Sequence, residues 1–214
     1  MIVYHPFEGD ISSSPVIYSP KSCFVMTQLG DDICPQIKRI RNVITRLLKK
    51  YNIAELDANS TTTGGDYMTK IWKQTFASPI GIAIISEDLP ARTIGNIFYE
   101  LGLMDSYGKE TLVIKTPKCD IPSDLKRTEY INAENRYSRK IESFLNNIQK
   151  RADYYELVAD QIELGDPVQA IDYKRRAYLI TGENRIKSSA NRLYKLRKTE
   201  IDKQSQFFIN DFLR

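Results

Sequence analysis

The stretch TIGNIFYELGLMDSYGKETLVIK, residues 93–115, decides the fold. It predicts a short helix, a stop at Gly108 and then a strand over residues 111–115. The helix carries apolar side chains on nearly every side, so we expect it to be buried against other elements. Those side chains are Ile94, Ile97, Phe98, Leu101, Leu103 and Met104.

One carboxylate, Glu100, lies inside this apolar run, and Asn96 precedes it by four residues. Residues four apart share a helix face, so both side chains are predicted to point the same way. An ionised carboxylate among apolar groups costs several kcal/mol unless it is paired or faces a wet pocket. Two interpretations stay open. Glu100 is either a functional carboxylate or a first-turn glutamate that the helix dipole stabilises behind an Asn96 N-cap.

Short apolar segments alternate with helical patterns through residues 21–150. Besides the central helix, the patterns predict strands at 23–26, 53–56, 79–86, 111–115 and 129–131, and helices at 35–50, from Asp66 onward and at 133–150. This alternation predicts an α/β domain with a parallel sheet covered by helices on both faces. Ligands bind such sheets beyond the carboxyl ends of the strands. The segments that meet there are residues 27–31, Asp57, residues 86–88 and the Asn96/Glu100 face.

The two ends of the chain differ from this central part. Residues 1–20 are rich in Pro, Ser and Gly and predict an extended leader, in which His5, the only histidine, is incidental. Residues 151–214 predict a helical hairpin and a tail helix over 184–207, with a stripe that includes Tyr154 and Leu157. The hairpin is similar to one tetratricopeptide-type repeat. A single such unit needs further apolar surface to bury its core, from the sheet domain or from a second subunit. This region is therefore either a structural cap or a partner-binding module. We expect a homo-oligomer through these helices.

Composition narrows the function classes. The net charge of +4 and pI near 8.8 permit an anionic ligand such as a nucleotide, but no long Lys/Arg tract indicates nucleic-acid binding. Three scattered cysteines without a CxxC pair argue against a disulfide framework and a zinc site. We expect no signal peptide and no membrane span, hence a cytoplasmic protein, and we expect neither a metal nor a resident cofactor.

Several segments follow one another at spacings that suggest a family. They are Cys23-Phe24-Val25-Met26 with Gly30, Gly64-Gly65-Asp66 through Ile71-Trp72, the NIFYELG stretch at 96–102, Gly108-Lys109, and IPSDLKR at 121–127. Over about residues 22–148 this pattern resembles the nucleoside 2-deoxyribosyltransferase-like proteins of bacteria, which are related in fold to TIR domains. The chain departs from the family at Ile94-Gly95-Asn96, where Asn-Pro-Asn is usual.

The resemblance implies a flavodoxin-like parallel sheet and chemistry at an N-glycosidic bond of a nucleoside, a nucleotide or NAD, with NAD as a substrate rather than a cofactor. Glu100 inherits the role of the glutamate that acts on the sugar. Asn96 is expected to hold sugar hydroxyls, and Asp88 or Asp57 to contact the ribose or the base. The backbone from Gln28 through Gly30 precedes a helix N-terminus, which suits a phosphate, and Tyr99 either stacks on the ligand or belongs to the core.

TIR-like relatives often serve in bacterial antiphage defence, so NAD hydrolysis in defence is one form of this expectation. Two alternatives use the same residues differently. In the first, the sheet domain is a non-catalytic nucleotide sensor whose helical region reads out the ligand. In the second, the protein is an oligomeric scaffold that has lost ligand binding.

Overall fold

The computed structural model describes residues 16–30, 33–58, 67–121 and 130–214. They form two compact units. The first, which we call the sheet unit, holds Lys21–Asn147, and the second, the helical unit, holds Ile148–Arg214 together with residues 16–20. His5, Asp31 and the segments 64–66 and 122–127 that the sequence singles out lie outside the described residues.

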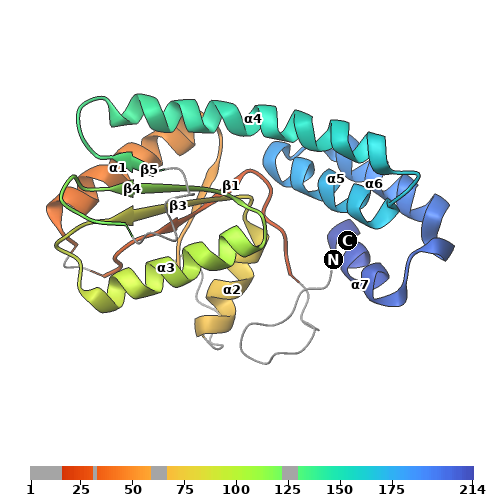
Figure 1. The fold of residues 1–214 in the computed structure, drawn as a ribbon, viewed down its shortest axis with the longest axis horizontal. Coiled ribbons are helices and arrows are strands. Elements are labelled where there is room, and N and C mark those ends of the chain that lie inside the picture. Colours follow the sequence, from red (N-terminus) through yellow and green to blue (C-terminus); the bar gives the residue numbers. More distant parts are fainter. Residues whose placement is uncertain (1–15, 31–32, 59–66, 122–129) are drawn as a thin grey trace. The chain divides into compact units, whose positions relative to one another are not determined.

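The sheet unit alternates strands and helices. Its elements are β1 (Ser22–Met26), α1 (Pro35–Lys50), β2 (Ala54–Leu56), α2 (Tyr67–Ala77), β3 (Ile80–Ile85), α3 (Ala91–Ser106), β4 (Glu110–Lys115), β5 (Tyr130–Asn132) and the first part of α4 (Tyr137–Ile162). The strands pair in the order β2-β1-β3-β4-β5, all parallel. This is the order of flavodoxin-like folds. Helices α1 and α4 cover one face of the sheet, and α2 and α3 cover the other (Figure 1). The predicted α/β fold is therefore confirmed.

The two central strands are short, continuous apolar runs, as expected for strands buried on both faces. Every residue of β1 and of β3 is buried. Gly81 of β3 lets α3 approach the sheet closely, because a Cβ at this position would lie 2.4 Å from Sδ of Met104. This contact fixes how deep α3 lies on the sheet.

Helix α3 corrects two details of the sequence analysis. It begins at Ala91 behind Pro90, so Asn96 lies in its second turn and is not its N-cap. Its buried residues are Ile97, Leu101 and Met104, whereas Tyr99 is 40% exposed. The helix covers the sheet with one face only, so the expectation of burial all round is wrong. Its other side is available to a ligand.

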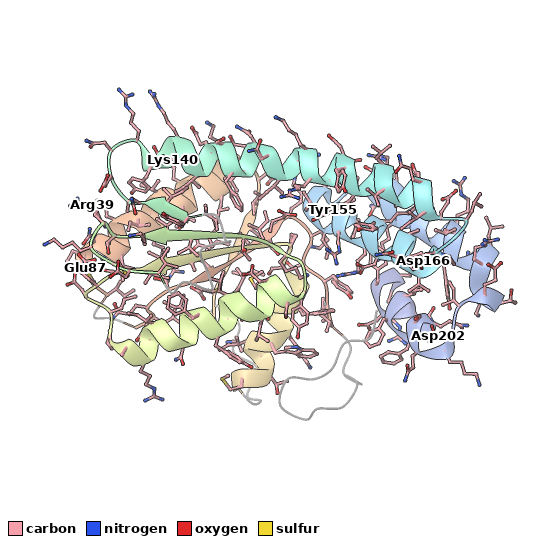
Figure 2. The ribbon with its side chains drawn as sticks, in the orientation of Figure 1. Arg39, Glu87, Lys140, Tyr155, Asp166 and Asp202 are labelled. Atoms are coloured by element: carbon pink, nitrogen blue, oxygen red, sulfur yellow. The ribbon has the colours of Figure 1, made fainter. Side chains whose placement is uncertain are left out.

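The helical unit also departs from the prediction. Helix α4 runs without interruption past residue 150, and it is followed by α5 (Pro167–Thr181), α6 (Asn184–Arg197), a 3₁₀ turn, η2 (Lys198–Glu200), and α7 (Lys203–Leu213). The predicted single helix over 184–207 is thus broken, because Ile201 is extended and Asp202 caps a new helix. Asp166 and Asp202, labelled in Figure 2, accept hydrogen bonds of 3.0 and 2.9 Å from the backbone at the starts of α5 and α7.

The C-terminal helical extension is confirmed, and its core includes residues of the predicted leader. The backbone N–H of Val16 donates to the carboxylate of Asp211 at 3.0 Å, and Tyr18 meets the ring of Phe212 edge-on. The carboxylate of Asp172 accepts hydrogen bonds from Arg175 at 3.0 and 2.7 Å and from Arg176 at 2.9 Å. Arg175 is only 5% exposed, so this pairing keeps a buried cation neutralised.

Candidate functional site

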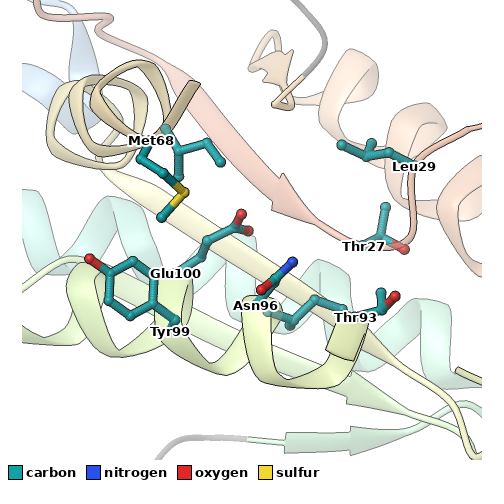
Figure 3. Close-up of a pocket in the computed structure, with 9 residues that line it drawn as sticks. Thr27, Leu29, Met68, Thr93, Asn96, Tyr99 and Glu100 are labelled. Carbon is teal, nitrogen blue, oxygen red and sulfur yellow. The ribbon is translucent and has the colours of Figure 1, made fainter. Parts of the chain in front are cut away.

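A cavity of about 200 Å³ opens in the sheet unit beside the carboxyl end of β1 (Figure 3). It lies at the point where the chain leaves the adjacent strands β1 and β3 toward opposite edges of the sheet. Ligands of flavodoxin-like sheets bind at this switch point. The lining residues come from the β1–α1 connection, α2 and α3: Thr27, Leu29, Met68, Ile71, Thr93, Asn96, Ile97, Tyr99 and Glu100.

Glu100 is the one ionisable carboxylate among the lining residues. It projects from the middle of α3 into the hollow (Figure 3), and burial raises its pKa from 4.5 to about 7. The lining set includes no Lys, Arg or His, and no ion pair joins Glu100 to another residue of the described segments. Its charge is therefore uncompensated there, in a place that a ligand can reach.

Asn96 and Tyr99 flank Glu100 on the same helix. Asn96, four residues before it, lines the same cavity, as the helical spacing predicts. Tyr99 also lines the cavity and leaves 40% of its surface exposed at the rim. Three of the seven candidate residues from the sequence are thus brought together: Asn96, Tyr99 and Glu100.

Thr27 is a lining residue that the sequence analysis included only in a range. It directly follows β1 and is 8% exposed. Its hydroxyl has no hydrogen-bond partner in the described part of the chain. Buried polar groups in folded proteins almost always have such a partner. Since this hydroxyl borders the cavity, a ligand can supply the missing hydrogen-bond partner.

The other candidates near the cavity lie at its edge or beyond it. Gln28 and Gly30 flank the lining residue Leu29, and the Gln28 side chain accepts a 3.5 Å hydrogen bond from the backbone N–H of Cys34. Asp88 is exposed after β3, and its carboxylate accepts a 3.6 Å hydrogen bond from Sγ of Cys34. None of these three residues lines the cavity.

Asp57 is placed differently from the others. Its carboxylate forms an ion pair with Arg41 of α1, whose guanidinium also lies 3.0 Å from Glu55. Asp57 is not among the lining residues of the cavity. Its charge stabilises the packing of α1 against the end of β2 rather than facing the cavity.

The burial of Glu100 makes stability depend on pH. A raised pKa means that the folded state holds this proton more tightly than the unfolded state, so the folded state loses stability as pH rises from about 4.5 to 7. We expect Glu100→Gln to remove this loss of about 3 kcal/mol. Urea unfolding at pH 5 and pH 8 measures it. Equal pH dependence in the two proteins would contradict the prediction.

The sequence matches no protein-family model, and no curated protein matches it either. Of the helices in the described segments, none combines the length and the apolar character that a membrane crossing requires.

Proposed function

We propose that the sheet unit cleaves or transfers at the N-glycosidic bond of a nucleoside, a nucleotide or NAD, with Glu100 acting on the sugar. The observation that carries this proposal is the uncompensated carboxylate in a cavity at the β1/β3 switch point. The resemblance of residues 22–148 to deoxyribosyltransferase-like and TIR-like proteins points to the same chemistry. A role in bacterial antiphage defence is one setting for a TIR-like NAD hydrolase.

The chemistry suits a carboxylate in this environment. As the bond from the anomeric carbon to the base nitrogen breaks, its electron pair leaves with the base and positive charge builds on the sugar. The ionised Glu100 carboxylate either stabilises that charge or attacks the anomeric carbon to form a glycosyl ester. Water or a second base then takes the sugar from Glu100, which regenerates the carboxylate.

The volume of the cavity is consistent with its holding only part of the substrate. Whole small-molecule ligands occupy pockets of roughly 300 Å³ or more, and this cavity measures about 200 Å³. It therefore suits the sugar with part of the base. A 5′-phosphate, where present, would extend toward the backbone of residues 28–30, ahead of the N-terminus of α1.

Incubation of the 214-residue chain with NAD and, separately, with deoxynucleosides tests the proposal. Release of free base, measured by chromatography, supports an enzyme, and the substrate that reacts identifies the sugar. Ligand binding in a calorimetric titration without base release would instead favour a nucleotide sensor. No interaction with any nucleotide would favour a scaffold.

Thr27 gives a second way to probe the cavity. Thr27→Val keeps the shape of the side chain and removes the unpartnered hydroxyl, so we expect the ligand-free protein to gain about 1 kcal/mol. We expect the same change to weaken substrate binding about tenfold if the hydroxyl bonds the sugar. Thermal melts and titrations measure both effects, and Thr27→Ser is the control. A Val variant that is less stable yet binds as wild type would contradict this role.

A further inference from the structure

Helices α4 and α6 of the helical unit lie side by side and run in the same direction. At the start of α6, Arg185 forms an ion pair of 2.6 Å with Glu156 of α4. At the end of α6, Arg197 donates a 2.7 Å hydrogen bond to the carbonyl oxygen of Leu164, just beyond α4. Both contacts are exposed, so the surface between the two helices is open. We call this surface the α4/α6 face.

Large apolar side chains stand exposed on the α4/α6 face. Leu157 of α4 is 57% exposed, Leu164 78% and Leu196 of α6 72%. The sequence analysis grouped Tyr154 and Leu157 in one helical stripe. Both are exposed, at 54% and 57%, because α4 turns Ala152, Tyr155 and Ala159 inward instead. On α4, positions 153, 157 and 160 recur at helical spacing on the outer side, and Leu164 follows just beyond the end of the helix.

The two halves of the α4/α6 face carry opposite charge. Residues 153–163 contain the acids Asp153, Glu156, Asp160 and Glu163 and no base. On this side helix α6 carries the bases Arg185, Arg192, Lys195 and Arg197, and the helix contains no acid. Its fifth base, Lys187, lies over the rings of Tyr178 and Phe212 instead. Asp153, Arg192 and Lys195 are exposed, and the intramolecular ion pairs of the described chain do not include them.

We propose that the α4/α6 face binds a second copy of this chain about a two-fold axis. In such a dimer the acidic α4 of each protomer lies against the basic α6 of the other, and the exposed leucines are buried between them. A two-fold interface uses the same patch on both subunits and has to be complementary to itself. A face that carries exposed leucines, acids on its α4 half and bases on its α6 half meets that condition.

Size-exclusion chromatography with light scattering on the 214-residue chain tests the proposal. At about 100 µM protein and low salt, we expect twice the chain mass of 24.7 kDa. Two variants with altered charge sharpen the test: Arg192→Glu with Lys195→Glu, and Asp153→Lys with Gln161→Lys, which adds a positive charge at an exposed neutral position. Each alone places like charges across both halves of the interface, so we expect dimerisation to weaken about tenfold or more.

Mixing the two variants in equal amounts is the decisive step. In the mixed dimer one half of the interface keeps its native charges and the other half has them exchanged, so we expect dimers to return. Lys38→Glu with Lys118→Glu, a matched charge change at exposed positions of the sheet unit, should leave the mass unchanged. A monomeric wild-type protein, or mixed variants that stay monomeric while folded by circular dichroism, would overturn the proposal and point to another partner for this face.

Discussion

Glu100→Gln is expected to lower the rate of base release by about 10³-fold or more, because the amide cannot attack the anomeric carbon or neutralise its charge. The amide has nearly the same shape, so substrate binding should change far less than turnover. Steady-state kinetics on the substrate found with the wild-type protein measure both. Since the ionised carboxylate is the active form, wild-type kcat/KM should also rise as pH passes about 7.

The control for this variant is Glu134→Gln, an exposed glutamate of the same unit that does not line the cavity. It should keep wild-type kinetics. If Glu100→Gln turns over substrate at the wild-type rate while folded, the glycosidic proposal fails. If Glu100→Gln loses activity together with its near-ultraviolet circular dichroism, the loss reports on folding. Glu100→Asp, which shortens the side chain by one methylene, is then the deciding variant. For the proposal to stand, it has to show the same kinetic defect in a folded protein.

Asp172→Asn is expected to destabilise the helical unit by about 3–5 kcal/mol, because it leaves the buried Arg175 guanidinium without a counter-charge. Burial by itself would raise the pKa of Asp172, but the charges of Arg175 and Arg176 outweigh it and lower that pKa to about 2. Hydrogen exchange of the α5 amides measures the effect within this unit. Asp120→Asn, at an exposed aspartate of the sheet unit, is the control and should change little.

The Asp172 carboxylate also makes the stability of the protein depend on pH in the acid range. A lowered pKa means that the unfolded state binds this proton more readily, so the stabilisation is present above about pH 4 and is lost as pH falls toward 2. Wild-type protein should lose about 2 kcal/mol over that window from this group, and the asparagine variant should lack this part of the loss. An identical acid response in both proteins would contradict the assignment.

The sequence was sufficient wherever a local pattern determines the structure. Helix α1 begins and ends where Pro35 and the aliphatic spacing to Lys50 predict, and β1 and β3 follow continuous apolar runs. The shared orientation of Asn96 and Glu100 also followed from their spacing. These features depend on residues within a few turns of one another.

Features that depend on distant residues were not predictable in this way. Asp57, which follows β2, does not line the cavity and forms an ion pair with Arg41 of α1. The hydroxyl of Thr27 is significant only because the packing around the end of β1 buries it without a partner. The helix end expected at residue 150 is wrong because α4 contains no Gly or Pro there and its buried stripe continues through Ala152 and Tyr155. The two compact units nevertheless divide near that position, between Asn147 and Ile148.

The uninterrupted course of α4 has a consequence for preparing shortened forms of the protein. A cut between Asn147 and Ile148 would leave the sheet unit with only about three turns of this helix and would remove the buried Ile148 from it. Ending the polypeptide after Ile162, ahead of the turn at Gly165, would retain the whole helix. A crystallographer seeking a smaller fragment should therefore place the terminus there.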